Sequence, residues 1–353
     1  MTACETLSIP PSASVPDPVL SIKDLTVEFQ TEDGVVHAVD GVTYDVFAGE
    51  TLGIVGESGS GKSVSMMSLL SLIPQGKIVR GEAWFKGRSL MTMPKDELRR
   101  LRGGDMAMIF QDPMTSLNPV LEVGFQISEA IETHNPGISS GEARRRGIEL
   151  LRIVGVPNPE KRYDQYPHEF SGGMRQRAMI AMAIANEPSV LIADEPTTAL
   201  DVTIQAQIIE VLKTAQQTTH AATILITHDL GLVAELADRV IVMYAGRVVE
   251  SGDVRTIFAS PRHPYTVGLM ESLPGLTIDD DSLRPIPGQP PSLIMRPPGC
   301  AFHPRCALSN GRALCRTQVP ELRNVGDSGH SSACHYSEEL VGYKSRLVEG
   351  TPA

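Results

Sequence analysis

The chain has 353 residues, of which 41% are hydrophobic and 21% are charged, and its formal net charge is −11 at pH 7. These values fit a large globular core with an appended module and exclude a chain that is disordered throughout. The negative charge leaves no general basic surface for a phosphate backbone, so nucleic acid is a poor candidate partner. No stretch approaches the roughly 20 apolar residues of a membrane-spanning helix. We therefore expect a cytosolic protein that reaches any membrane through partners.

A Pro- and Ser-rich stretch opens the chain, and we expect a disordered leader over residues 1–19 because this stretch has too little apolar surface to pack. Apolar β-rich runs then alternate with helical patterns, which predicts an α/β fold around a mainly parallel sheet with flanking helices. The expected strands are Leu20–Gln30, Val35–Val46, Thr51–Val55, Ala107–Phe110, Val190–Ala193, Thr223–Thr227 and Arg239–Tyr244.

Composition divides the chain further. We expect one α/β domain over residues 20–260, with an inserted helical lobe at about 112–167 that includes the helical patterns Ile127–Thr133 and Glu142–Val154. After residue 260 the chain becomes rich in Pro, Gly and Cys. This shift predicts a small Cys/Pro-rich C-terminal module over residues 261–353.

The segment Gly56-Glu57-Ser58-Gly59-Ser60-Gly61-Lys62-Ser63 matches the phosphate-binding loop pattern at every fixed position. It follows the apolar run Leu52–Val55 and precedes a helical pattern, as the motif requires. The loop backbone would turn its N–H groups toward the phosphates of ATP at a helix N-terminus. We expect Lys62 to reach the β- and γ-phosphates and Ser63 to ligate Mg²⁺.

A second candidate element is the apolar strand Val190–Ala193, which ends in Asp194 and Glu195. Open α/β sheets bind their ligands at the carboxyl ends of strands. We expect Asp194 to hold Mg²⁺ and Glu195 to act as the general base that polarises the attacking water.

The third element is Ser171-Gly172-Gly173, which precedes the apolar helical pattern Ala178–Ala185. A Ser-Gly-Gly turn that opens a helix makes a second anion-binding N-terminus. One phosphate chain does not need two such sites in one subunit, so we expect this site to act on ATP held by another subunit.

Together these motifs resemble the ABC ATPase family, whose signature motif is Leu-Ser-Gly-Gly-Gln. Phe170 and Met174 replace the first and last members here, while Ser171 and Gly173 are intact. The resemblance implies a P-loop ATPase core with an antiparallel β subdomain and a helical lobe. It also implies a nucleotide sandwich, in which ATP on the glycine loop of one subunit is completed by Ser171 and Gly173 of the other.

Four further positions match motifs of this family. Gln111 matches the Q-loop, whose side chain touches Mg²⁺ and the attacking water, and Ala199-Leu200-Asp201 matches the D-loop at the dimer interface. His228 matches the switch histidine that contacts the γ-phosphate. Phe29 falls where the family stacks an aromatic ring on adenine. The resemblance thus implies Glu195, His228 and Gln111 as catalytic residues.

Two regions resemble the ATP-binding subunits of oligopeptide/dipeptide importers: Gln111–Pro119, and His263–Thr266 with the Pro- and Cys-rich end. Nickel importers share much of this pattern and remain an alternative. The glycine loop resembles the first of two paralogous ATPases. The resemblance implies a heterodimer with a sister ATPase on two permease subunits, at the cytoplasmic face of the cell membrane, fed by an extracytoplasmic peptide-binding protein.

Cys300, Cys306, Cys315 and Cys334 lie within the C-terminal module. Members of this branch with such a set resemble proteins that carry a [4Fe–4S] cluster, which four thiolates can ligate. Zn²⁺ is the main alternative because four thiolates also suit it, and free thiols in a small module are the third.

Three other functions fit the sequence less well. ABC ATPases that act on DNA insert a long coiled coil between the glycine loop and the signature, and no sustained heptads occur here. The ribosome-acting members carry two cassettes in one chain, whereas this chain has one. A scaffold that binds ATP without hydrolysis would not need Glu195 and His228.

Overall fold

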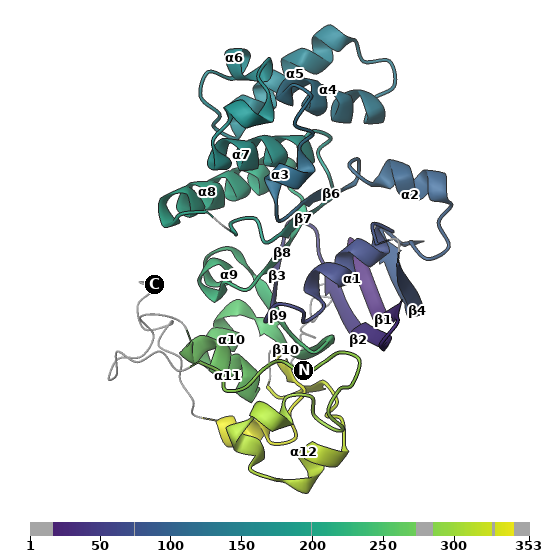
Figure 1. Cartoon of the computed structure of the whole chain (residues 1–353), viewed down its shortest axis with the longest axis vertical. Helices are drawn as coiled ribbons and strands as arrows, with labels where there is room; N and C mark the ends of the chain where they lie inside the picture. Colours follow the sequence, from purple (N-terminus) through teal and green to yellow (C-terminus); the bar gives the residue numbers. More distant parts are fainter. Residues whose placement is uncertain (1–16, 74, 199, 273–284, 327–328, 342–353) are drawn as a thin grey trace, which may run out of the picture.

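The computed structural model describes residues 17–73, 75–198, 200–272, 285–326 and 329–341. Most of the expected leader, residues 1–16, lies outside these ranges. Figure 1 shows three regions around a central sheet: helices α4–α6 at one end, an antiparallel sheet at one side, and the region around α12 at the other end.

The central sheet has eight strands in the order β11-β12-β10-β9-β3-β8-β7-β6. The five strands from β9 to β6 are parallel, and β10, β11 and β12 extend the sheet with antiparallel pairs. These strands are β3 (Thr51–Val55), β6 (Met106–Ile109), β7 (Val190–Asp194), β8 (Ala222–Thr227), β9 (Arg239–Tyr244), β10 (Arg247–Asp253), β11 (Arg323–Asn324) and β12 (Ser331–Ser332).

The second sheet is antiparallel and has the order β2-β1-β4-β5. Its long strands β1 and β2 pair from Leu20 opposite Val46 to Thr31 opposite Gly34, with bulges along the way. The strands are β1 (Leu20–Thr31), β2 (Gly34–Val46), β4 (Gly76–Phe85) and β5 (Arg88–Ser89).

Figure 1 shows where the helices lie around the two sheets. They are α1 (Lys62–Leu69), α2 (Lys95–Leu101), α3 (Pro113–Ser116), α4 (Val123–His134), α5 (Ser140–Ile153), α6 (Pro159–Tyr163), α7 (Gly172–Ala183), α8 (Val202–Thr219), α9 (Leu230–Leu236), α10 (Val254–Ala259), α11 (Pro264–Glu271) and α12 (Ala313–Thr317), with the 3-10 turns η1 (Pro167–Glu169), η2 (His303–Arg305), η3 (Ala307–Ser309) and η4 (Ser337–Leu340). None of the helices within the described ranges combines the length and the apolar character that a bilayer crossing requires.

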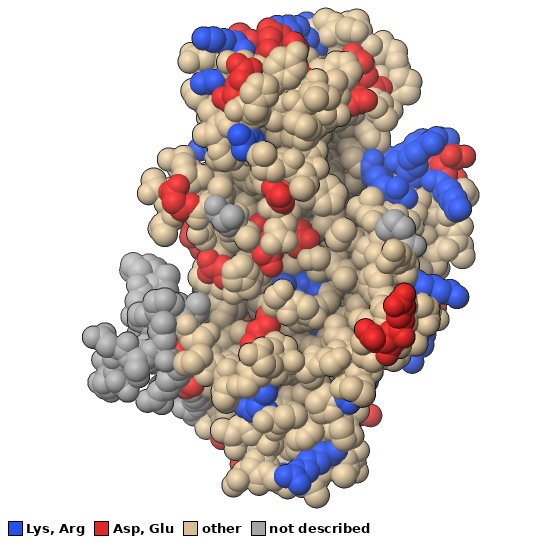
Figure 2. Space-filling view, in the orientation of Figure 1, with Lys and Arg blue, Asp and Glu red and all other residues tan. Residues whose placement is uncertain are grey.

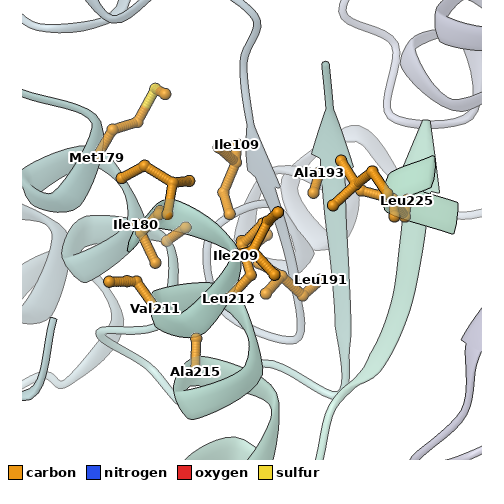
Figure 3. Close-up of a cluster of buried hydrophobic side chains, with 14 of the residues drawn as sticks. Ile109, Met179, Ile180, Leu191, Ala193, Ile209, Val211, Leu212, Ala215 and Leu225 are labelled. Atoms are coloured by element: carbon orange, nitrogen blue, oxygen red, sulfur yellow. The ribbon is translucent and has the colours of Figure 1, made fainter. Parts of the chain in front are cut away.

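The parallel strands are buried on both faces, which explains why their sequences are continuous apolar runs. In β7, Leu191 and Ala193 face one hydrophobic cluster, while Val190 and Ile192 face another on the opposite side. This alternation follows from the two-residue period of a strand. Figure 3 shows the first cluster, in which Ile180 of α7 and Ile209 of α8 lie close to the β7 and β8 side chains.

Charged side chains are mixed over the surface. On the face in Figure 2, basic side chains gather over α2 and around the end formed by α4–α6, with acidic and uncharged ones between them. Among the described residues on this face they do not merge into one continuous basic area. This distribution agrees with the acidic net charge.

The structure differs from the expected strands at some strand ends and contains strands that were not expected. Strand β6 ends at Ile109, so Phe110 lies just beyond it and is partly exposed. Strands β4, β5, β10, β11 and β12 were not expected. In β4 the sequence Gly76–Phe85 carries charged residues on exposed positions, because only one side of this sheet is buried.

Candidate ATP-binding and hydrolysis site

Four adjacent parallel strands bring the predicted site residues to one edge of the central sheet. The order β3-β8-β7-β6 places four carboxyl ends side by side. Lys62 and Ser63 follow β3, and His228 follows β8. Asp194 ends β7, Glu195 comes directly after it, and Gln111 follows β6. The sheet topology therefore brings together residues that are far apart in the chain, with 166 positions between Lys62 and His228.

The glycine loop between β3 and α1 needs its glycines for steric reasons. Gly61 has φ 96° and is the N-cap of α1. A Cβ atom on Gly61 would lie 2.2 Å from the carbonyl oxygen of Ala38, and one on Gly56 would lie 2.2 Å from that of Met243. Both contacts are too short for real atoms, so any larger residue would displace the loop.

Lys62 is buried and holds the two ends of the loop together. Its Nζ donates hydrogen bonds to the carbonyl oxygens of Gly56 at 2.8 Å and Glu57 at 3.0 Å. Burial lowers the pKa of Lys62, while the nearby carboxylates of Glu195, Asp194 and Glu57 oppose that shift. An anion bound in the loop would favour the charged ammonium further.

Ser63 and Asp194 form a pair suited to a hard cation. The Ser63 hydroxyl donates a hydrogen bond to Asp194 Oδ1 at 2.7 Å. Burial raises the pKa of Asp194, and Glu195 adds to this shift. A hydroxyl and a carboxylate are oxygen ligands of the kind Mg²⁺ prefers, and a cation there would offset the cost of burying the charge. The pair thus fits a Mg²⁺ site.

Glu195 lies at the centre of the cluster. Its Oε2 accepts hydrogen bonds from Gln111 Nε2 at 3.1 Å and from Thr198 Oγ1 at 2.8 Å. Its Oε1 lies 3.5 Å from Nδ1 of His228, whose side chain is 60% exposed. Glu195 has the uncommon φ of 46°, which marks a sharp turn directly after β7. The carboxylate is therefore held in place but open toward His228.

The signature residues lie at the N-terminus of α7 and not at the strand ends. Ser171 is the N-cap of α7, and its hydroxyl accepts a hydrogen bond from the Met174 backbone N–H at 3.3 Å. Gly173 packs tightly, since a Cβ atom there would lie 2.8 Å from Ile204. Within the described ranges, no hydrogen bond or ion pair joins Ser171, Gly172 or Gly173 to the glycine loop. One chain therefore does not bring the two anion-binding N-termini together.

The other predicted residues have local partners. Asp201 is the N-cap of α8 and accepts hydrogen bonds from the backbone N–H groups of Thr203 and Ile204. Ala199 of the predicted D-loop lies outside the described residues. Phe29 is half-buried in β1, and Gly76 opposite leaves room for its ring. Ser58 and Gly59 are exposed at the tip of the glycine loop, while Ser60 is buried there.

The four C-terminal cysteines line one largely apolar pocket, together with His303 and His335. All four are free thiols. Burial raises the pKa of each thiol, of Cys300 to about 11 and of Cys334 to about 12. Among the described residues, however, no group of three or more His, Cys, Asp and Glu side chains is arranged to hold a metal ion. The predicted metal centre is therefore not confirmed.

The glycine loop also contacts residues after position 260, and the sequence does not indicate these contacts. The Glu57 carboxylate, inside the glycine loop, is paired with Arg305, which lies between Cys300 and Cys306. The Glu57 backbone N–H donates to the hydroxyl of Tyr265 at 2.7 Å. Tyr265 belongs to the segment His263–Thr266, which resembles the peptide-importer branch, but nothing in the sequence of that segment indicates its partner.

Comparison with known proteins agrees with this architecture. The family model described as ABC transporter matches residues 39–198, and the one described as oligopeptide/dipeptide transporter, C-terminal region, matches residues 249–313. The dipeptide transport ATP-binding protein DppD of Escherichia coli (strain K12) is 52% identical over 92% of this chain and 98% of its own length. The oligopeptide transport ATP-binding protein OppD of Bacillus subtilis (strain 168) is 54% identical over 88% of this chain and 87% of its own.

Solved structures are similar to about two thirds of this chain. The ATP-binding cassette MJ0796, described as a dimer in a post-hydrolysis state bound to ADP and Pi, has a TM-score of 0.60 and 27% identity, and the match covers 67% of this chain and 99% of that one. The cbiO1 protein of Clostridium perfringens has a TM-score of 0.58 and 29% identity, covering 69% and 91%. These matches confirm the P-loop ABC ATPase fold.

The chain therefore belongs to the ABC transporter family, within the branch of ATP-binding subunits that carry the oligopeptide/dipeptide transporter C-terminal region. It is an ATPase subunit of an ABC transporter.

Proposed function

We propose that this chain binds and hydrolyses ATP with Mg²⁺ and thereby drives the uptake of oligopeptides or dipeptides through an ABC importer. The observation that carries the proposal is the cluster at the strand ends, where Glu195 lies between Gln111 and His228. The names of the relatives at 50% identity or more, which are dipeptide and oligopeptide transport proteins, support the substrate class.

In the proposed reaction the glycine loop and Lys62 bind the phosphates of ATP, and Phe29 stacks on its adenine. Ser63, Asp194 and Gln111 would hold Mg²⁺, which supplies charge neutralisation for the leaving and attacking oxygens. Glu195 accepts a proton from the attacking water, since its carboxylate is fixed by Gln111 and Thr198. His228, 3.5 Å from Glu195, contacts the γ-phosphate.

The second half of the site is proposed to come from another subunit. Ser171 and Gly173 lie on α7, apart from the glycine loop of the same chain, as Figure 1 illustrates for α7 and α1. The resemblance to a cassette solved as a dimer supports a sandwich that encloses ATP between two subunits. We propose a paralogous ATPase as the partner, with Asp201 of the D-loop at the interface.

The remaining organisation follows from this proposal. Residues 20–260 form the ATPase domain, with the helical lobe at about 112–167, and residues 261–353 form the C-terminal extension. The lobe and Gln111 would transmit closure of the ATP site to two permease subunits in the membrane, with the chain peripheral on the cytoplasmic face. An extracytoplasmic binding protein would deliver the peptide, which this chain does not touch.

The proposal is tested by reconstituting the complete importer in liposomes with ATP on the side of this subunit. We expect uptake of labelled di- or oligopeptide that requires both ATP and the peptide-binding protein. The alternative, a nickel importer, predicts uptake of Ni²⁺ and no competition by peptides. Native mass measurement of the detergent-purified complex distinguishes one copy of this chain with a paralogue from two identical copies.

For the four-cysteine pocket we propose a [4Fe–4S] cluster with a structural role. The support is the donor set, because Cys300, Cys306, Cys315 and Cys334 share one pocket within a short segment. Their raised pKa values mean that thiolates are costly there unless a cation compensates them. Protein purified without oxygen should contain about four irons per chain and a broad visible absorption band. One zinc per chain, or no metal, would overturn the cluster.

A further inference from the structure

Glu57 is fixed on three sides inside the glycine loop. Its carboxylate accepts two hydrogen bonds from Arg305, with Nη1 to Oε2 at 2.6 Å and Nη2 to Oε1 at 2.9 Å. Its backbone N–H donates to the Tyr265 hydroxyl at 2.7 Å, and its carbonyl oxygen accepts from Lys62 Nζ at 3.0 Å. Two of these three restraints come from residues beyond 260, which lie outside the strand-loop-helix unit that builds the loop.

Arg305 is itself held rigidly. Its side chain is only 5% exposed, and Nε donates to the carbonyl oxygen of Pro287 at 2.9 Å. Nη1 also donates to the Tyr244 hydroxyl at 3.3 Å. The guanidinium lies 5.8 Å from the ring centre of Tyr244 and 5.9 Å from that of Phe302. Planar two-point pairing of this kind fixes both partners in direction as well as distance.

An aromatic cluster joins the loop to the C-terminal part of the chain. Tyr244, at the end of β9, lies 4.6 Å from Tyr265 and 5.2 Å from Phe302 between ring centres, and Tyr265 lies 5.3 Å from Phe302. These tilted and edge-on contacts are favourable aromatic geometries. Tyr265 and Arg305 thus reach Glu57 from one packed unit.

Two physical consequences follow for an anionic ligand. A free Glu57 carboxylate beside the loop would repel phosphate groups, and pairing with Arg305 neutralises it. The loop also contains Gly56, Gly59 and Gly61, all with positive φ, so its backbone is intrinsically adaptable. Restraining such a loop before the ligand arrives lowers the entropy cost of binding.

We propose that Arg305 is a positioning residue for ATP: it neutralises and orients Glu57 so that the glycine loop is ready to receive phosphates. In this proposal Arg305 acts on the nucleotide only through its pairing with Glu57. Through this pair the C-terminal extension controls the affinity of the ATP site. The inference rests on the proposed ATP-binding function of the loop.

The test measures the dissociation constant of a non-hydrolysable Mg–ATP analogue for the full chain, together with kcat and KM for ATP. Arg305→Ala should weaken analogue binding about tenfold or more and raise KM more than it lowers kcat. Arg305→Lys, which keeps the charge but not the two-point pairing, should lie between Ala and wild type. If Arg305→Ala does not fold, Arg305→Lys and Glu57→Gln carry the test.

Arg312→Ala is the matched control. Arg312 makes the same two-point pairing with Glu339, at 2.7 and 2.9 Å, within the C-terminal extension and without a contact to Glu57. Its loss should leave analogue binding unchanged. Equal weakening by both variants would mean a general effect of the extension on stability and would overturn the proposal.

A double-mutant cycle isolates the pair. In the Glu57→Gln background the carboxylate is gone, so Arg305→Ala should change analogue affinity by less than about twofold. The same loss in both backgrounds would overturn the mechanism through Glu57. If wild-type protein itself failed to bind the analogue, the proposed ATP site would be wrong, which is a distinguishable result.

Discussion

Gln111 donates a hydrogen bond to Glu195 at 3.1 Å although 84 positions separate the two residues in the chain. The bond ties the segment after β6 to the proposed general base at the end of β7. Replacing Glu195 by Gln keeps the shape but removes the proton acceptor. We expect ATP turnover to fall about 10²–10⁴-fold while ATP binding is retained.

Turnover and bound nucleotide, measured on the same preparation, check this prediction. Glu187→Gln is a suitable control, since Glu187 is exposed and has a φ of 51°, close to the 46° of Glu195. The control should hydrolyse ATP at the wild-type rate. Wild-type turnover in Glu195→Gln would contradict the assignment of the base.

The Ser63–Asp194 pair predicts a specific change in metal dependence. Ser63→Ala removes the hydroxyl that we propose as a Mg²⁺ ligand next to the buried Asp194 carboxylate. We expect the Mg²⁺ concentration for half-maximal ATPase activity to rise at least about tenfold. Ser89→Ala, in β5 of the antiparallel sheet, should leave it unchanged. An unaltered Mg²⁺ requirement in Ser63→Ala would exclude this hydroxyl as a ligand.

We expect the buried residue His263 to make the folded protein less stable in mild acid. The residue is buried, and burial lowers its pKa from 6.5 to about 3 in the folded protein. Below pH 6.5 the unfolded chain therefore binds a proton at His263 that the folded chain does not bind. The free energy of unfolding is therefore not reduced by His263 above pH 6.5. Below that pH the residue lowers it by up to about 1.4 kcal/mol per pH unit.

Urea unfolding of wild type and His263→Asn between pH 7 and 5 measures this contribution. Asparagine does not titrate and keeps an acceptor at the N-cap of α11, where His263 Nδ1 accepts from the Tyr265 N–H. The variant should show the shallower decline of stability with falling pH. Parallel curves would mean that His263 does not set the acid sensitivity.

Shortening Leu191 should leave a cavity in the main core and lower the free energy of unfolding. This β7 side chain is completely buried and lies in the cluster of Figure 3 with Ile209, Leu212 and Leu225. Leu191→Ala should reduce the free energy of unfolding by about 2–5 kcal/mol. Val202→Ala, at a position 83% exposed, should change it by less than about 0.5 kcal/mol. Calorimetry or chemical unfolding compares the two variants.

Local sequence patterns predicted the central elements because their causes are local. The apolar run Thr51–Val55 followed by glycines and Lys62 is a strand, a loop and a helix in the structure. Strand β9 has the expected bounds, Arg239–Tyr244. By contrast, β4 was not expected, since an exposed face interrupts its hydrophobic pattern and its identity depends on pairing with β1.

By itself, the sequence predicted the residues and the chemistry of the proposed ATP site. A glycine loop can bind phosphates only with its full set of residues in order, and Asp194-Glu195 follow a strand whose end must face that loop. The tertiary structure decided which distant groups act on them. Arg305 lies 248 positions from Glu57, and their pairing depends on how Tyr244, Tyr265 and Phe302 pack, because side-chain packing over such separations leaves no periodic trace in the chain.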